Sequence, residues 1–237
     1  MEIQQSLGGG AQRNFPLKGF TLAEVLITLG VIGVVAALTM PTLIKKYTNH
    51  VVETRLKAFY SQFNEAIKLA EAEYGDKKDW YFEIGENLGN YDIDVLDEWF
   101  MKYIGKNLKI IKTERFHWGG LFYYLANGSS FGFYNKNTRD LMFFPGNFKK
   151  CLKAHNNTYY ETIGYCSFIF NYMPIANNEE WHHNYNKGLE PWKYNWDGTE
   201  ESLKTNCAGS VRAFCSTWIQ HNNWTIPEDY PYPVGMY

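Results

Sequence analysis

The sequence predicts an α+β fold, in which one long N-terminal helix precedes a domain built around an antiparallel β-sheet. Two observations carry this prediction. Apolar residues recur at helical spacing almost without a break from residue 20 to residue 74. Farther on, apolar runs of strand length alternate with turn residues such as Asn127-Gly128. A chain of 237 residues is long enough for one well-packed domain plus a membrane helix, or for two small domains.

The first part of the long helix has the length and composition of a membrane span. From Phe20 to Met40 an α-helix rises about 31 Å, which matches the hydrocarbon core of a bilayer. Glu24 is an ionisable side chain within this run. A charge at mid-bilayer costs roughly 2.5–3.5 kcal/mol on insertion scales, so Glu24 is predicted to have a function.

Three further residues of the apolar run affect how a helix bends or packs. Gly30 and Gly33 allow close approach of a neighbouring helix. Pro41 lacks a backbone donor and clashes with the preceding turn, so the sequence predicts a kink or local melting there. Gly and Pro are also common in membrane helices, and these residues are informative mainly in combination with Glu24.

Beyond Pro41 the helical pattern continues as an apolar stripe, flanked by polar and charged positions. Gly75-Asp76 is predicted to end the helix. A stripe of this kind is typical of core packing rather than of a cofactor site. Its residues are Val52, Leu56, Phe59, Phe63, Ile67, Ala70 and Tyr74.

The remaining elements are shorter. Asp92 and Asp94 can cap a helix that extends to about Lys106. Its inward-facing residues are predicted to be Leu96, Trp99, Phe100 and Tyr103. Residues 120–134 are predicted to form two strands joined near Asn127-Gly128, a strong hairpin signal.

A second turn at residues 135–137 leads to a predicted strand, Leu141–Phe144, and Tyr165–Tyr172 is a fourth strand candidate. Residues 177–204 are predicted to be loop, residues 207–219 a short helix or strand, and the Pro-rich end from Pro227 extended chain.

The four cysteines lie in the C-terminal third. No pair has C-x-x-C spacing, and no Cys/His set has zinc-finger spacing. An even number beyond a membrane helix favours disulfides in an oxidising compartment over buried free thiols. Three pairings are possible, and proximity in the sequence favours Cys151–Cys166 and Cys207–Cys215.

The charge balance argues against one class of partner. The formal net charge is −2. Residues 1–19 carry Arg13, Lys18 and Glu2, so their removal leaves about −3. Neither value suggests binding to nucleic acid or to anionic lipid, which needs a concentrated basic face.

The N-terminal pattern resembles the type IV prepilin and type II secretion pseudopilin family, closely over about residues 13–43. Gly19 is followed by phenylalanine, by Glu24 at the fifth position after it, and by Pro41 at the twenty-second. The polar leader precedes the apolar run, whereas a secretory signal peptide places its apolar core before the cleavage site. The leader is fairly long and the soluble domain larger than in many major subunits of the family.

The resemblance implies a pilin-like fold and a processing route. A prepilin peptidase would remove leader residues 1–19 between Gly19 and Phe20, and Phe20 would be N-methylated. Residues 20–43 would form the transmembrane and polymerisation helix, residues 44–75 an amphipathic helix, and residues 76–237 the globular domain. The Phe20 amine of one subunit would pair with Glu24 of its neighbour and fix their axial register.

The resemblance also implies a structural role, as a subunit of a pilus or a secretion pseudopilus and not as an enzyme. No cofactor or metal is expected. The partners would be other pilins, the prepilin peptidase and an inner-membrane assembly platform. The location would be the bacterial inner membrane before assembly, and an extracellular or periplasmic filament afterwards. Pilus, secretion pseudopilus and DNA-uptake pilus, and major and minor subunits, stay open.

The rival interpretation is a single-pass anchored extracytoplasmic enzyme or binding protein, but its possible sites are weak. Residues 128–132 match the G-x-S-x-G pattern, yet lie in a predicted hairpin rather than a strand-to-helix turn. His182-His183, beside Glu179, Glu180 and Asp197, would point to opposite faces of a strand and so bind metal poorly. Two candidate sets remain. Asp92, Asp94 and Asp97 could bind calcium, although the EF-hand glycine and glutamate are absent. Trp181, Trp192, Tyr194 and Trp196 could bind a sugar or a surface, or could pin a loop to the sheet.

Overall fold

The computed structural model describes residues 19–82, 93–116, 120–133 and 138–237. The chain divides into two compact units, residues 1–44 and residues 45–237. Helix α1 (Leu22–Tyr74) contributes its first half to one unit and its second half to the other. The long apolar helix and the antiparallel sheet confirm the predicted α+β class.

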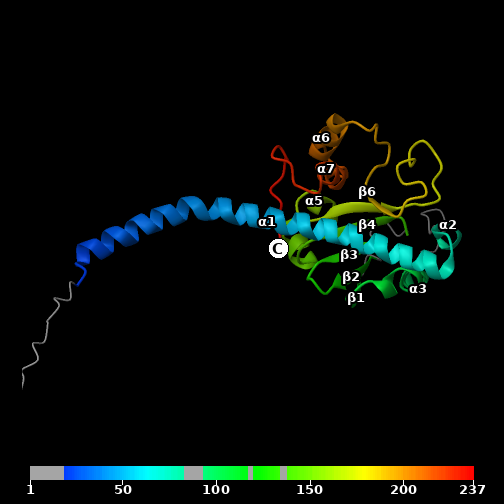
Figure 1. Cartoon of the computed structure of the whole chain (residues 1–237), viewed down its shortest axis with the longest axis horizontal. Helices are drawn as coiled ribbons and strands as arrows, with labels where there is room; N and C mark the ends of the chain where they lie inside the picture. Colours follow the sequence, from blue (N-terminus) through cyan, green and yellow to red (C-terminus); the bar gives the residue numbers. More distant parts are fainter. Residues whose placement is uncertain (1–18, 83–92, 117–119, 134–137) are drawn as a thin grey trace, which may run out of the picture. The chain divides into compact units, whose positions relative to one another are not determined.

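The second half of α1 packs on the sheet through the predicted stripe (Figure 1). Phe59 is its central contact: its ring stacks on Phe143 at 4.3 Å and meets Phe170 edge-on at 5.3 Å. Full burial of such a ring stabilises the fold by about 1.5–3 kcal/mol. The helix ends at Gly75, whose φ of +87° favours glycine. The buried residues of the helix are Val52, Leu56, Phe59, Phe63, Ala66, Ile67 and Ala70.

Among the described residues, three short helices lie between α1 and the first strand. Asp76 caps α2 (Lys77–Trp80) by accepting the Lys78 N–H. The predicted second helix is α3 (Ile93–Tyr103), followed by the 3₁₀ turn η1 (Gly105–Asn107). Leu96, Trp99 and Phe100 are buried as expected, whereas Asp92 lies outside the described residues.

In the described part of the chain, six strands form one antiparallel meander in sequence order. They are β1 (Ile110–Arg115), β2 (Leu121–Leu125), β3 (Ser130–Phe133), β4 (Asp140–Phe144), β5 (Phe168–Tyr172) and β6 (Leu189–Pro191). The predicted hairpin is β2–β3, with Gly128 at φ +82° in its turn. The predicted turn at 135–137 lies outside the described residues. Strand β1 was not predicted from the sequence.

Side chains alternate between the two faces of the sheet, and each face has its own core. The α1 side holds most of the buried rings, Phe131, Phe143 and Phe170 among them. On the opposite side, Phe122 stacks on Phe148 of α4 (Phe148–Ala154) at 4.3 Å. Asn147 caps α4 by accepting the Lys150 N–H at 3.0 Å.

The prediction of loop over residues 177–204 was wrong at two places. Strand β6 lies within it, and α6 (Glu200–Ala208) begins before its end. β6 is a strand because residues distant in the sequence pair with it, and local composition does not reveal such partners. Residues 207–219, predicted as one short helix or strand, contain the end of α6, a turn and most of α7 (Cys215–His221). The remaining helix, α5 (Tyr159–Thr162), follows α4.

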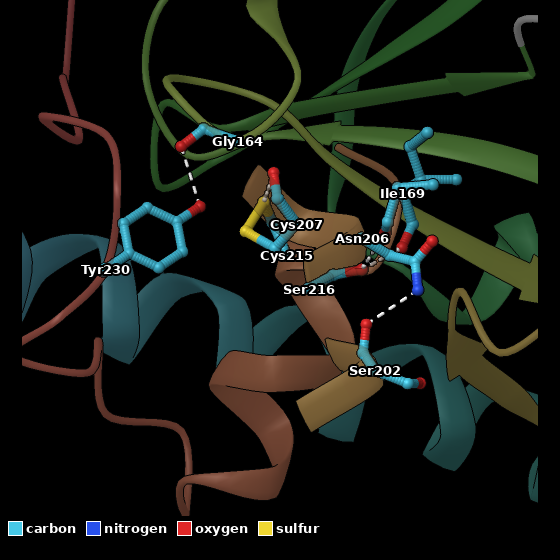
Figure 2. Close-up of a disulfide and its surroundings, with 9 residues drawn as sticks. Gly164, Ile169, Ser202, Asn206, Cys207, Cys215, Ser216 and Tyr230 are labelled. Atoms are coloured by element: carbon cyan, nitrogen blue, oxygen red, sulfur yellow. Dashed lines mark hydrogen bonds between the residues drawn. A yellow bond between two sulfur atoms is a disulfide. The ribbon is translucent and has the colours of Figure 1, made fainter. Parts of the chain in front are cut away.

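The four cysteines are paired as sequence proximity favours, Cys151 with Cys166 and Cys207 with Cys215. The second disulfide joins α6 to α7, and Figure 2 shows Tyr230 beside it. The Tyr230 hydroxyl donates to the Gly164 carbonyl at 2.8 Å. The C-terminal segment therefore packs over the region that this disulfide closes.

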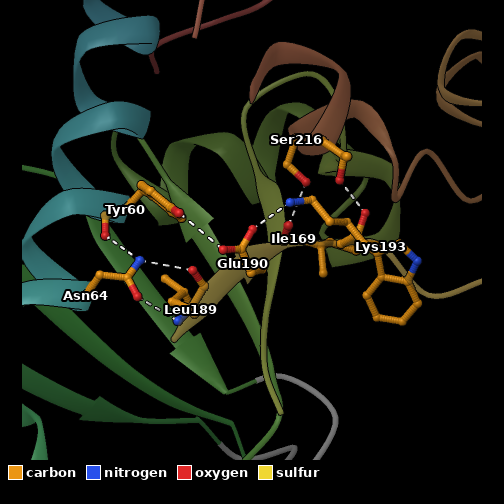
Figure 3. Close-up of polar contacts among 9 residues, drawn as sticks. Tyr60, Asn64, Ile169, Leu189, Glu190, Lys193 and Ser216 are labelled. Atoms are coloured by element: carbon orange, nitrogen blue, oxygen red, sulfur yellow. Dashed lines mark hydrogen bonds and ion pairs between the residues drawn. The ribbon is translucent and has the colours of Figure 1, made fainter. Parts of the chain in front are cut away.

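Strand β6 is held by side chains of α1 (Figure 3). Asn64 Nδ2 donates to the Leu189 carbonyl at 3.0 Å, and Asn64 Oδ1 accepts the Leu189 N–H at 2.9 Å. Tyr60 donates to Glu190 Oε1 at 3.2 Å, and Lys193 Nζ lies 2.5 Å from Glu190 Oε2. These contacts satisfy polar groups that the edge of the sheet would otherwise bury without partners.

Candidate functional site: an exposed apolar helix with one carboxylate

The first half of α1 exposes a long apolar surface. Its most apolar 18-residue window has a mean hydropathy of 2.3, and none of that window is buried. By length and composition this helix can cross a membrane. Soluble proteins rarely expose large contiguous apolar patches, and such patches commonly mark sites of interaction with membranes or with other proteins. Its large exposed residues are Leu22, Val25, Leu26, Ile27, Leu29, Val31, Ile32, Val34, Val35, Leu38, Met40, Leu43 and Ile44.

The N-terminus of α1 is closed by a reciprocal pair of hydrogen bonds between Thr21 and Glu24. The Thr21 N–H donates to Glu24 Oε2 at 2.8 Å, and the Glu24 N–H donates to Thr21 Oγ1 at 3.2 Å. This is the capping box expected of Thr-x-x-Glu at a helix start, and sequence analysis missed it. Glu24 therefore has a role within its own chain as well as any role in assembly.

The Glu24 carboxylate can still accept a further donor. The Thr21 N–H donates to Oε2, and the Thr21 side chain also interacts with the carboxylate. An ionised carboxylate offers about four acceptor sites, so Oε1 can receive a further donor without breaking the cap. Phe20, Val25 and Thr28 line the open depression that contains Glu24. A cation that reached this depression would meet a carboxylate already fixed in position.

The predicted cleavage site lies immediately before the cap. Gly19 and Phe20 are exposed and precede the helix, and the Phe20 side chain is 88% exposed. A Cβ built on Gly19 meets no atom within 4 Å. Among the described residues, therefore, none places a steric demand for glycine at position 19.

Pro41 lies inside α1 without interrupting it, so of the two predicted outcomes, a kink or local melting, melting does not occur, and the kink stays a prediction. A proline within a helix removes one hydrogen bond, here to the carbonyl of Ala37, and the flanking turns continue the helix. Two turns earlier, a Cβ built on Gly30 or Gly33 meets nothing within 4 Å. Both glycines thus lie on open helix surface, where a neighbouring helix can approach.

The serine motif lies in the β2–β3 hairpin, as predicted. Ser130 begins β3, and its side chain is buried. A Cβ built on Gly132 would lie 2.6 Å from the Leu121 carbonyl and 2.7 Å from the Phe122 ring. The second glycine of the motif is therefore explained by close strand packing, and the strand-to-helix turn of a nucleophile elbow is not present here.

The histidine pair is arranged differently from the prediction. His182 and His183 lie in a turn rather than a strand, and their ring centroids are 3.9 Å apart instead of on opposite faces. His183 Nε2 lies 3.0 Å from the Trp196 carbonyl oxygen. Among the described residues, no group of three His, Cys, Asp or Glu side chains is placed to hold a metal ion.

Of the aspartates considered for calcium, Asp94 pairs with Arg115, and Asp97 accepts the Tyr123 hydroxyl at 2.8 Å. The loop that carries Trp181, Trp192, Tyr194 and Trp196 was predicted either to bind a sugar or surface or to be pinned to the sheet, and three of its aromatic side chains pack against one another. Trp181 is 6% exposed and packs on Trp192 at 5.7 Å and on Tyr194 at 4.8 Å.

Comparison with known proteins gave one result. A family model described as a family of unknown function (DUF6613) matches residues 42–234. The match thus covers the second unit and begins just after Pro41. Searches of the curated proteins and of the solved structures gave no match.

Proposed function

The chain belongs to the DUF6613 family, whose function is unknown, and we propose that it is a structural subunit of a type IV pilus or type II secretion pseudopilus. In this proposal residues 1–19 are a cytoplasmic leader, and a prepilin peptidase cuts between Gly19 and Phe20. The mature chain is held in the bacterial inner membrane by the first half of α1. It then enters a pilin-like filament, extracellular or periplasmic, through the same helix.

One observation carries the proposal: an exposed apolar helix of membrane length has a single carboxylate, Glu24, one turn after Phe20. A plain membrane anchor would use this carboxylate only to cap its own helix, and the cap needs no charge. Apolar packing of helices from many subunits would cover the exposed surface, and Gly30 and Gly33 leave room for close approach.

The role of Glu24 follows from its surroundings. Cleavage after Gly19 would create an α-amino group on Phe20, and a positive charge in an apolar filament core needs a partner. Because Oε2 of Glu24 caps its own helix, Oε1 of one subunit can accept the Phe20 amine of the next. Leaving one such charge unpaired costs on the order of 3–5 kcal/mol, which would select a single axial register.

Processing is the step that tests this function first. Intact-mass analysis of the protein from a bacterial host with a prepilin peptidase should give a chain that begins at Phe20 and carries one N-methyl group. Gly19→Glu should leave the chain unprocessed. Gly19→Ala, which the fold accommodates, is the matched control for substitution as such. A mature chain that begins at Met1, or beyond residue 40, would refute the proposal.

A further inference from the structure

The first strand leaves one edge of the sheet open. β1 pairs with β2 on one side, and no described strand pairs with its other side. The register shifts between Ile110 and Lys112, which makes Ile111 a bulged residue, and its side chain is 69% exposed. Bulges and lysines on an edge strand discourage simple strand addition. A partner at this edge must therefore bind mainly through side chains.

An open groove runs along this edge, between the end of α3 and β1. Met101, Leu108, Ile110 and Ile111 supply its apolar part, and Lys106 and Lys112 are also part of its lining. We call this groove, together with the exposed Lys102 and Lys109 that neighbour its lining residues in the sequence, the lysine groove. Cationic side chains beside apolar ones fit a segment that carries carboxylates.

The charge of the lysine groove comes from one stretch of sequence. Residues 102–112 contain four lysines and no acidic residue. Lys106 pairs with Glu73, and Lys112 with Glu114. Lys102 lies over the rings of Tyr74 and Tyr103. Lys109 is exposed and, within the described chain, forms no ion pair. The two lysines that line the groove itself thus have acidic partners, and Lys102 and Lys109 supply the positive charge that is available to a second molecule.

The opposite edge of the sheet carries an acidic surface. α6 packs on α7, and α7 packs on β5 and β6, so α6 lies toward the β6 edge (Figure 1). Lys204 lies 3.2 Å from Glu200 and 3.1 Å from Asp229, which places two acidic segments side by side. We call this surface the acidic end. Its exposed carboxylates are Asp197, Glu200, Glu201, Glu228 and Asp229.

We propose that the lysine groove of one copy of this chain binds the acidic end of a second copy. The inference rests on the proposed function, because a filament holds the soluble domains of successive subunits against each other. Charge complementarity identifies the partner, and the small net charge of −2 lets copies approach without strong mutual repulsion. Since the two surfaces lie at opposite edges, the contact is heterologous and repeats into an open helical array rather than closing a dimer.

Charge reversal with rescue tests this contact. Lys102→Glu/Lys109→Glu reverses the groove, and Glu201→Lys/Glu228→Lys reverses the acidic end. The control is Lys57→Glu/Lys68→Glu, the same change of charge at exposed positions on α1. Self-association of the full chain in detergent micelles is measured by light scattering, and filament yield by shearing from cells. Each reversal alone should lower both by on the order of tenfold, the four-residue reversal should restore them, and the control should leave them unchanged.

Raising the salt concentration from about 0.05 M to about 0.5 M should weaken self-association of the wild-type chain in micelles. The inference is overturned if filaments form and either double reversal assembles like the wild type, or if the four-residue reversal gives no rescue. It is also overturned if the two reversals abolish binding to another protein while copies still associate normally. Absence of filaments, with salt-sensitive and rescuable association retained, would instead refute the pilin proposal and leave this contact standing.

Discussion

Gly188 and Asn64 share a space that has no room for a further atom: a Cβ built on Gly188 would lie 1.9 Å from Asn64 Oδ1. The same Oδ1 accepts the Leu189 N–H, so the glycine allows α1 to hold the edge strand β6. Gly188 does not have a positive φ, and its requirement is one of space rather than of backbone conformation.

We therefore predict that Gly188→Ala and Asn64→Ala each destabilise the folded domain by about 2–4 kcal/mol. The first displaces the Asn64 amide, and the second leaves the buried Leu189 backbone without two partners. The two losses should not add, because both act through the same pair of hydrogen bonds. Denaturant unfolding of the full chain in micelles measures the free energy of unfolding of each variant. Fully additive losses in the double variant would contradict this α1–β6 clamp, by which we mean the two hydrogen bonds between Asn64 and Leu189.

The α1–β6 clamp also shows where sequence reasoning stopped. The stripe from Val52 to Ala70 follows from periodicity alone, since a helix of that pattern must bury one face. Strand β6 has three residues, one of them Pro191, in a tract rich in Asn and Trp. It is a strand because β5 pairs with it and Asn64 binds its backbone, and both partners are distant in the sequence.

In the candidate site, too, some residues could be predicted from the sequence and others could not. Glu24 stood out as an ionisable side chain in an apolar run, whereas Gly19 and Phe20 were singled out by the resemblance to prepilins. The capping box was readable as Thr21-x-x-Glu24, but the carboxylate was considered only for its charge. The stacking of His182 on His183 was not readable, because it depends on a turn that adjacent residues do not specify.

A second prediction concerns alkaline pH. Burial, followed by the nearby Glu190 carboxylate, raises the pKa of Tyr60 to about 12 from its ordinary value of about 10. The folded state thus holds this proton more tightly than the unfolded state. The stability it contributes is complete below about pH 10 and is lost as pH rises toward 12. Tyr60→Phe should reduce the loss of stability between about pH 10 and 12. If the free energy of unfolding of this variant varied with pH as in the wild type, the role assigned to Tyr60 would be wrong.

The disulfides give a third prediction. Peptide mapping without reduction should recover Cys151–Cys166 and Cys207–Cys215. Each closes a short loop, so chain entropy predicts a stabilisation of roughly 2–3 kcal/mol per bridge at best. Cys207→Ala/Cys215→Ala should lower the denaturant concentration at the unfolding midpoint. A reducing agent should then lower the midpoint of this variant less than that of the wild type. Four alkylatable thiols in protein isolated from the cell envelope would contradict both pairings.

The fourth prediction separates the two roles of Glu24. Glu24→Gln keeps a side-chain acceptor for the capping box but removes the charge. Thr21→Val removes the hydroxyl acceptor but keeps the charge, at a cost of about 0.5–2 kcal/mol in helix stability. If the charge serves assembly and the cap serves only the helix, Glu24→Gln should impair filaments and Thr21→Val should not. Both variants should leave the stability of the domain formed by residues 45–237 unchanged.

The most direct measurement is the ratio of Glu24→Gln protein in sheared filaments to that in membranes, with Thr21→Val as the matched control. The variant should be made, inserted and cleaved before Phe20, yet accumulate in the membrane fraction. The reason is that each added subunit leaves one Phe20 amine unpaired, at on the order of 3–5 kcal/mol. Incorporation of Glu24→Gln into filaments at the wild-type ratio would contradict the proposal that this carboxylate joins one subunit to the next.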